Sequence, residues 1–365
     1  MAPAWSSMAA SVHARADSPD PPSEAAPQGD SRLLVDDDAV RAFLLEEYGA
    51  LGERAQFEFV SGGVSSTIIR VTADDECFIL KQALPQLRVA TTWLSNQKRS
   101  GIEVRCARLL ERFVPGSIPE ILREFPQRYA FSMACAPTGS VTWKAMLLEG
   151  DIRGADARKA GSILGDIHAK STTVPGLVED FADKSIFDEL RVDAYLRFTA
   201  TRHPDLAEML HELAAAMLGP GICLVHADFS PKNLLVTPDD RMLAIDHEVA
   251  HWGSPSFDLG FLLNHLCLKA LRFPRFADEY LAAADETLTT YRSRITPDID
   301  AAAAGQLGGR MLGALMLARI DGKSPVEYIE EDGDRDRVRA VARRILTGDV
   351  ANMDAALAVV RSARA

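Results

Sequence analysis

The sequence has few cysteines, no long apolar run and no cluster of basic residues. Its cysteines number 5 in 365 residues, they are scattered and odd in number, and no two form a C-x-x-C pair. Most of them lie in apolar stretches such as CFIL and GICLVH. We therefore expect buried, reduced thiols in a cytoplasmic protein, at Cys77, Cys106, Cys135, Cys223 and Cys267.

Two other absences limit the partners. No stretch approaches the roughly 18 consecutive apolar residues that indicate a membrane-spanning helix. The formal net charge is -12, and no basic run offers the density of positive charge that nucleic-acid phosphates require. We therefore expect neither a membrane nor a nucleic acid as partner, and any phosphate site must be built locally. The sequence leaves open whether the chain is a monomer or a homodimer.

The chain begins with a segment that differs from the rest in composition. Residues 1–33 are rich in Ala, Ser and Pro and lack the apolar stretch of a secretory signal. Because such a composition cannot bury a core, we expect a disordered tail. A helix is predicted at 35–49, where acidic residues precede an apolar periodicity.

Beyond this helix, the pattern changes from mainly strand-like to mainly helical. The strand-like runs cover residues 56–60, 67–71, 77–83, 118–122 and 128–134. One helix is expected among them, at about 91–113. After residue 137 helical periodicity dominates, and two short apolar runs at 222–226 and 242–246 are expected to form a strand pair. The pattern predicts a small antiparallel sheet with one helix, followed by a larger helical region.

The most informative segment is LVHADFSPKNLLV, followed closely by MLAIDHE. The first apolar run delivers His226 and Asp228, Asn233 follows after a short polar stretch, and the second run delivers Asp246. Phosphoryl transfer needs a carboxylate near the acceptor hydroxyl and oxygen ligands for Mg²⁺. Asp228, Asn233 and Asp246 supply such atoms from the ends of two apolar runs.

This spacing resembles the H-G-D-x-x-x-x-N loop and the following Asp of the aminoglycoside phosphotransferase/choline kinase superfamily. Ala227 stands where the loop usually has glycine. The resemblance implies an α+β, protein-kinase-like two-lobed fold. It implies a nucleotide-binding lobe at 34–136 and a helical lobe at 137–365 that holds the catalytic loop and the acceptor site.

The resemblance also assigns roles within the loop. It implies Asp228 as the catalytic base, His226 as a support of the loop, and Asn233 and Asp246 as ligands of Mg²⁺. In some members of the superfamily a carboxylate two residues further on also approaches a metal, so Glu248 is a third candidate ligand, with a solvated or salt-bridged side chain as the alternative. In the segment SFDLGF, Asp258 resembles the aspartate that braces the catalytic loop.

The strand-rich region offers candidates for nucleotide binding. In SGGVSSTIIRV the backbone amides and hydroxyls around Ser65 and Ser66 could cover ATP phosphates, and an ordinary hairpin turn is the alternative. Lys81 lies one hairpin later in an apolar strand, where a buried ammonium needs an anionic partner. Phosphate and a carboxylate from the next helix would meet this need. Glu103 is the first candidate for that carboxylate and Glu111 the alternative.

By the same resemblance, YAFSMAC lies at the adenine hinge and offers the backbone of Met133 and Cys135, with a plain edge strand as the alternative. Two segments, KQALPQLR and LMLARIDGKSPVEYI, are also similar to 5-methylthioribose kinases. There the second segment carries paired arginines that contact the sugar. Here Arg319 stands beside Ala318, which implies a related sugar, polyol or hydroxy acid as acceptor.

The sequence thus predicts a small-molecule kinase that uses ATP and Mg²⁺. Only eleven residues separate Asp246 from Asp258, which leaves no room for the activation loop of a protein kinase. Two alternatives stay open within this fold. One is an aminoglycoside phosphotransferase, and the other is a non-catalytic nucleotide-binding protein.

Overall fold

The structure is a computed structural model and describes residues 33–61, 63–88 and 93–363. The predicted disordered tail, residues 1–33, lies outside the described residues except for its last residue. The chain divides into two compact units, Met1–Arg54 and Ala55–Ala365. In the described part of the chain, no helix combines the length and the apolar character needed to cross a membrane.

The described part of the first unit, residues 33–54, contains two helices, α1 (Asp37–Tyr48) and α2 (Ala50–Arg54). α1 begins after Asp36, whose side chain accepts a hydrogen bond from the amide of Ala39 at 2.9 Å. This is the usual way to satisfy an amide at the start of a helix. The predicted helix at 35–49 is therefore confirmed.

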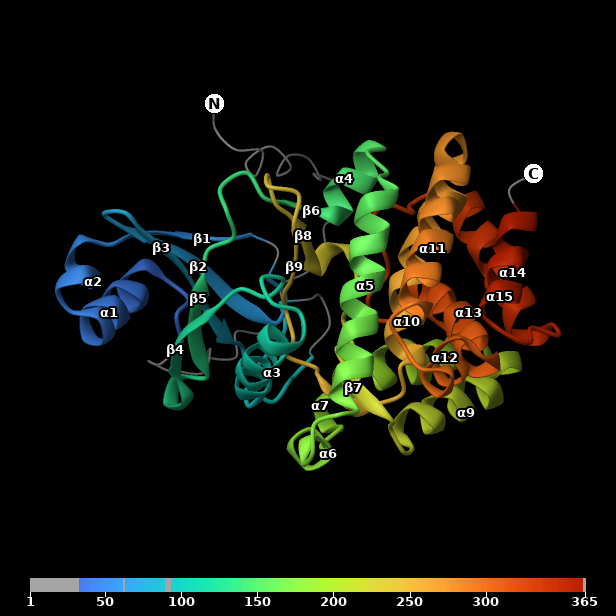
Figure 1. Ribbon diagram of the computed structural model, residues 1–365, viewed down its shortest axis with the longest axis horizontal. Helices are drawn as coiled ribbons and strands as arrows, with labels where there is room; N and C mark the ends of the chain where they lie inside the picture. Colours follow the sequence, from blue (N-terminus) through green and yellow to red (C-terminus); the bar gives the residue numbers. More distant parts are fainter. Residues whose placement is uncertain (1–32, 62, 89–92, 364–365) are drawn as a thin grey trace, which may run out of the picture. The chain divides into compact units, whose positions relative to one another are not determined.

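The second unit opens with a five-stranded antiparallel sheet (Figure 1). Its strands are β1 (Gln56–Phe59), β2 (Ser66–Ala73), β3 (Glu76–Ala83), β4 (Ile121–Phe125) and β5 (Ala130–Ala134), in the order β1-β2-β3-β5-β4. All five predicted strands are present, within a few residues. Because β3 is the middle strand, Lys81 is enclosed by Ile68 on one neighbour and Phe131 on the other.

One helix, α3 (Arg99–Phe113), connects β3 to β4. It begins later than predicted. Part of the expected helix, residues 89–92, lies outside the described residues, and residues 93–98 are not helical. Gln97 and Arg99 instead donate to backbone carbonyls at the end of β3: Gln97 to Ala83 O at 2.8 Å and Arg99 to Leu84 O at 2.7 Å. These bonds fix the start of α3 against the sheet.

The rest of the unit is mainly helical. The longer segments are α4 (Trp143–Glu149), α5 (Gly154–Ser171), the π-helix η2 (Asp188–Arg197), α8 (Phe198–Arg202), α9 (Ala207–Leu218), α10 (Ser256–Arg272), α11 (Ala277–Arg292), α12 (Pro297–Ala304), α13 (Gln306–Asp321), α14 (Asp332–Thr347) and α15 (Met353–Ser362). α10 packs against α11 and α13, and α11 against α5, as Figure 1 shows. Since α10 is buried on nearly every face, it forms the centre of the core.

The predicted pairing of the apolar run 222–226 with the run 242–246 is wrong. β7 (Cys223–Val225) pairs with β10 (His251–Gly253), whereas β9 (Met242–Ala244) pairs with β8 (Leu234–Val236). β8 also pairs with β6 (Val141–Thr142). The physical reason is that the end of the catalytic loop, NLLV, is itself a strand. It forms a tight hairpin with the next apolar run, and closing so short a loop costs little entropy.

The prediction of reduced thiols is wrong for one pair. Cys77 and Cys135 form a disulfide, with a Cα–Cα distance of 5.7 Å. The strand register explains it: Phe78 lies opposite Ala134, so the next positions outward bring the two cysteines together. Spacing in the sequence does not reveal this, because the partners are 58 residues apart. The other three cysteines are free and buried as predicted. The cytoplasmic location stays a prediction.

Candidate active site

Lys81 holds two carboxylates from distant parts of the chain. Its Nζ donates to Oε1 and Oε2 of Glu103 at 2.8 and 2.7 Å, and to Oδ1 of Asp246 at 2.5 Å. Burial by itself would lower the pKa of Lys81, but Asp246 and Glu103 outweigh burial and raise it. The amine is therefore a permanent cation. Glu111, the alternative partner, instead accepts a hydrogen bond from the amide of Gly116 at 3.1 Å.

The two carboxylates respond differently to the shared lysine. Burial would raise the pKa of Asp246, but Lys81 and other cations outweigh it and lower the pKa below its ordinary value. For Glu103 burial prevails over Lys81 and raises the pKa to about 7. Asp246 is thus the fixed anion of the group, whereas burial opposes the negative charge on Glu103.

Glu248 is held by an arginine that the sequence analysis missed. Arg99, the first residue of α3, is fully buried, and its Nε donates to Oε2 of Glu248 at 3.0 Å. Its Nη1 donates to Asn96 O at 3.1 Å, and its Nη2 to Leu84 O at 2.7 Å and to Ser65 O. Arg99 therefore joins Glu248 to the loop that precedes β2. In the sequence it looks like any polar residue within the predicted helix.

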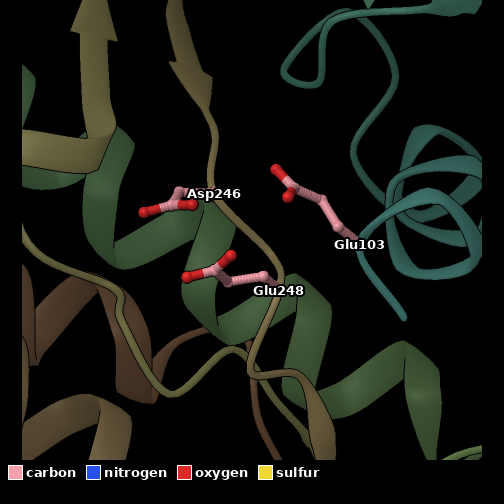
Figure 2. Close-up of side chains that lie close together, drawn as sticks. All are labelled: Glu103, Asp246 and Glu248. Atoms are coloured by element: carbon pink, nitrogen blue, oxygen red, sulfur yellow. The ribbon is translucent and has the colours of Figure 1, made fainter. Parts of the chain in front are cut away.

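Three carboxylates come together at this point. One oxygen each of Glu103, Asp246 and Glu248 lie within 4.8 Å of one another. Figure 2 shows Glu103 extending from α3 toward the segment that carries Asp246 and Glu248. Of the predicted metal ligands, Asp246 and Glu248 belong to this group. The structure adds Glu103, for which we predicted a role with Lys81 alone.

Asn233 lies beside Asp228 in the catalytic loop. Its Nδ2 donates to the backbone oxygen and to Oδ2 of Asp228, at 2.9 and 2.8 Å. Oδ2 also lies 3.1 Å from Nη2 of Arg191 and 2.9 Å from Nζ of Lys232. By contrast, Oδ1 of Asp228 accepts no hydrogen bond from the residues that the structure describes. One carboxylate oxygen is fixed and the other is available.

The charge on Asp228 is stabilised by its surroundings. Burial would raise its pKa, but Arg191 and Lys232 outweigh burial and lower it. Arg191 also donates to Ala227 O at 2.8 Å, so it holds both the loop backbone and the carboxylate. It lies on the π-helix η2, a type of helix that occurs often at functional sites. The sequence analysis missed it, because DELRVDAYLRF reads as a regular amphipathic helix.

Asp258 braces the catalytic loop as its position in the sequence predicts. Its carboxylate accepts hydrogen bonds from the amides of His226 and Ala227, both at 2.7 Å. Ala227 has φ 62°, the left-handed region that costs roughly 1–2 kcal/mol for a residue other than glycine. The two bonds to Asp258 hold the chain in this conformation. They explain why alanine can stand where the loop usually has glycine.

His226 links the catalytic loop to the end of β9. Its Nδ1 accepts from the amide of Asp228, and its Nε2 donates to Ile245 O, both at 3.2 Å. Burial lowers the pKa of the imidazole, so it is neutral and carries its proton on Nε2. The ring therefore fixes the backbones of Asp228 and of the residue before Asp246 relative to each other.

The remaining candidates lie in three places. Ser65 and Ser66 stand at the start of β2, and Oγ of Ser66 is buried without a partner among the described residues. Met133 lines a small pocket together with Glu103 and Asp246. Cys135 follows β5, where its sulfur is committed to the disulfide, so only its backbone is available for a nucleotide.

Arg319 lies on α13, and the side chains of Tyr195 and Arg191 connect it to Asp228. Its Nη1 donates to Tyr195 OH at 3.0 Å and to Oγ of Ser324 at 3.0 Å. The same tyrosine ring lies 6.0 Å from the guanidinium of Arg191, which contacts Asp228. The structure therefore brings Arg319 to the catalytic loop through Tyr195.

Comparisons with known proteins show which family the chain resembles. Residues 56–294 match the sequence model of the phosphotransferase enzyme family (APH). Methylthioribose kinase of Exiguobacterium sibiricum is 24% identical over 274 residues, which cover 67% of this chain and 70% of that protein. Methylthioribose kinase of Pectobacterium atrosepticum is 24% identical over 286 residues, which cover 67% of this chain and 70% of that protein.

Solved structures show the same fold. A choline/ethanolamine kinase family protein of Mesorhizobium loti has 19% identity and a TM-score of 0.54, with 89% of this chain and 99% of that chain covered. A microcompartment-associated aminopropanol kinase has 16% identity and a TM-score of 0.54, with 88% of this chain and 100% of that chain covered.

The chain belongs to the phosphotransferase enzyme family, since the match extends over more than half of it. It is an enzyme, a small-molecule kinase with a protein-kinase-like α+β fold. The fold class and the family expected from the sequence are therefore confirmed. The lobe boundary between residues 136 and 137 stays a prediction.

Proposed function

We propose that this enzyme transfers the γ-phosphate of ATP to a hydroxyl group of a small metabolite, such as a sugar, a polyol or a hydroxy acid. The observation that supports this most directly is the state of Asp228. Its Oδ2 is surrounded by Asn233, Arg191 and Lys232, while Oδ1 accepts no hydrogen bond from the described residues. A carboxylate oxygen presented in this way is suited to receive an acceptor hydroxyl.

Asp228 would act mainly by orientation. Since its pKa lies below the ordinary value, it is ionised at neutral pH and is a weak base toward a free alcohol. Phosphoryl transfer passes through a loose transition state in which positioning contributes most of the catalysis. We therefore propose that Oδ1 accepts the hydrogen bond of the hydroxyl, aligns its oxygen for attack, and receives the proton as the new O–P bond forms.

The residues around Lys81 fit a nucleotide with Mg²⁺. Mg²⁺ takes oxygen ligands, and Oδ2 of Asp246 and Oε1 of Glu248 each accept no hydrogen bond from the described residues. We propose these two carboxylates and the side-chain oxygen of Asn233 as its ligands. Bound Mg²⁺ would neutralise charge on the β- and γ-phosphates. Lys81 would hold the α- and β-phosphates, and Glu103 would fix the lysine.

Other residues would complete the nucleotide and acceptor sites. The loop at Ser65 and Ser66, which Arg99 holds through Ser65 O, would cover the phosphates. The backbone around Met133 and Cys135 would receive the adenine. Arg319 would contact the acceptor. The names of the relatives, methylthioribose kinase and choline/ethanolamine kinase family protein, support a small hydroxylated acceptor.

The proposal is tested by incubating the full-length protein with ATP, Mg²⁺ and a panel of small alcohols, sugars and hydroxy acids. ³¹P NMR would detect any phosphorylated product. We expect ADP and one phosphate monoester in equal amounts, no product from Asp228→Asn, and normal product from Asp285→Asn, a change at the surface ion pair with Arg361. Consumption of ATP that releases only inorganic phosphate would contradict the proposal.

A further inference from the structure

Two basic side chains, Lys269 and Arg319, have no carboxylate partner among the described residues. Lys269 on α10 is fully buried. Its Nζ donates only to neutral oxygens, Tyr328 OH and His265 O, both at 3.4 Å, and lies 4.5 Å from the centre of the Tyr328 ring. A buried ammonium normally requires an anionic partner to offset the loss of water. Among the described residues, Lys269 has none.

Arg319 on α13 is in the same situation. Its Nη1 donates to Tyr195 OH, Ser324 Oγ and Ser324 O, all of which are neutral. Its Nε is buried and has no hydrogen-bond partner among the described residues. Since a guanidinium stays charged in proteins, this charge is uncompensated. Donors remain unused on the side chain that is best suited to bind a carboxylate or a phosphate.

The nearby carboxylates are already paired with other lysines. Glu327 forms an ion pair with Lys144, and Asp193 lies 2.6 Å from Nζ of Lys323. Burial and, after it, the charge of Lys144 lower the pKa of Lys269 to about 7, and Glu327 opposes them without restoring the ordinary value. Arg319 also lowers this pKa, because its positive charge repels the charge of protonated Lys269. The region therefore carries an excess of positive charge.

This positive region adjoins Asp228. Arg319 donates a hydrogen bond to Tyr195, and the guanidinium of Arg191 lies over the ring of the same tyrosine. Nη2 of Arg191 in turn lies 3.1 Å from Oδ2 of Asp228. Arg319 is therefore connected to Asp228 through the side chains of Tyr195 and Arg191. Burial lowers the pKa of His265, one turn before Lys269 on α10, and the charges of Arg319, Lys269 and Lys232 lower it further.

We propose that the acceptor carries an anionic group, a carboxylate or a phosphate, which Lys269 and Arg319 bind while its hydroxyl lies on Asp228. This inference rests on the proposed function and narrows it. An anion would neutralise both cations and supply the acceptors that their free donors lack. A cationic acceptor, such as a choline or an aminoglycoside, would be repelled by the same charges, and a neutral polyol would leave them unpaired.

The test compares pairs of ligands that differ only in the anion: glycerate with glycerol, gluconate with sorbitol, and glycerol phosphate with glycerol. Choline and ethanolamine serve as cationic probes. Binding to the full-length protein is measured by calorimetry without nucleotide, and turnover by ³¹P NMR with MgATP. The variants are Lys269→Met and Arg319→Gln, with Lys323→Met as matched control because Asp193 already neutralises that lysine.

We expect at least one anionic member to bind more tightly than its neutral partner, by roughly 10- to 100-fold, the effect of a hydrogen bond to a charged group. The preference should fall by a similar factor in Lys269→Met and Arg319→Gln and persist in Lys323→Met. Which pair shows the preference distinguishes a carboxylate from a phosphate. If Arg319→Gln fails to fold, Lys269→Met alone decides.

Three outcomes would overturn the inference. They are equal or tighter binding of the neutral or cationic ligands, a preference for anions that survives in both variants, and no binding of any anionic ligand at millimolar concentration. A fourth outcome separates this inference from the proposed function. If an anion binds and its binding depends on Lys269, but no phosphorylated product forms, the anion site is supported and the proposed function is contradicted.

Discussion

Replacing Arg99 by methionine should destabilise the protein far more than a typical charge removal. Arg99 is fully buried, and its partner Glu248 is 3% exposed. Removing one member of a buried ion pair leaves the other charge without compensation, which costs about 3–5 kcal/mol. The carbonyls of Ser65 and Leu84 lose a donor as well. We therefore expect the free energy of unfolding to fall by about 4 kcal/mol.

The control is Arg108→Met on the same helix. Arg108 lies 3.1 Å from Glu124, but its side chain is 54% exposed, and exposed ion pairs contribute about 0–1 kcal/mol. Urea denaturation of both variants and of wild type measures the difference. A double-mutant cycle with Glu248→Gln should give a coupling energy of roughly 1–3 kcal/mol between the buried partners. Equal losses for both arginines, or no coupling, would refute the reasoning.

Three further predictions concern other parts of the structure. Burial lowers the pKa of His251 from 6.5 to about 4. The unfolded chain therefore binds more protons between these values, stability rises with pH across this window, and His251→Asn should reduce that rise by about 3 kcal/mol in urea denaturation at several pH values. The denatured, unreduced chain should show three reactive thiols rather than five in a thiol assay, and reducing the Cys77–Cys135 bond, which closes a separation of 58 residues, should cost roughly 4 kcal/mol or less. Glu103→Gln should weaken ATP binding in calorimetry whereas Glu111→Gln should not, and the reverse result would contradict the placement of Glu103.

The sequence was informative wherever a residue's chemistry was unusual for its surroundings. A lysine inside an apolar strand predicted a carboxylate partner, and Glu103 lies against Lys81 in the structure. The spacing from His226 to Asp246 predicted one site from two apolar runs, and the imidazole of His226 does connect them. In both cases burial of a polar group left few physically reasonable arrangements.

The residues that were missed depend on long-range contacts. Arg99 and Arg191 lie in segments with ordinary helical patterns, and their burial follows from tertiary packing against Glu248 and Asp228. A buried arginine carries no local signal, since the sequence around it reads as a solvent-exposed face. Lys269 was missed although it lies in an apolar segment, LNHLCLKAL. The pairing of Cys77 with Cys135 depends on strand register, which the sequence does not specify at that distance.

The measurement that tests the central claim most directly separates the two aspartates of the site. Binding of a non-hydrolysable ATP analogue is measured by calorimetry with and without Mg²⁺ for Asp228→Asn and Asp246→Asn, and turnover of each variant is followed with ATP. Asp246→Asn should lose both Mg²⁺-dependent nucleotide binding and turnover. Asp228→Asn should bind the analogue with Mg²⁺ as wild type does, while its turnover falls by ~10²–10⁴-fold, the range expected for a lost general base. Normal turnover of Asp228→Asn would contradict the account.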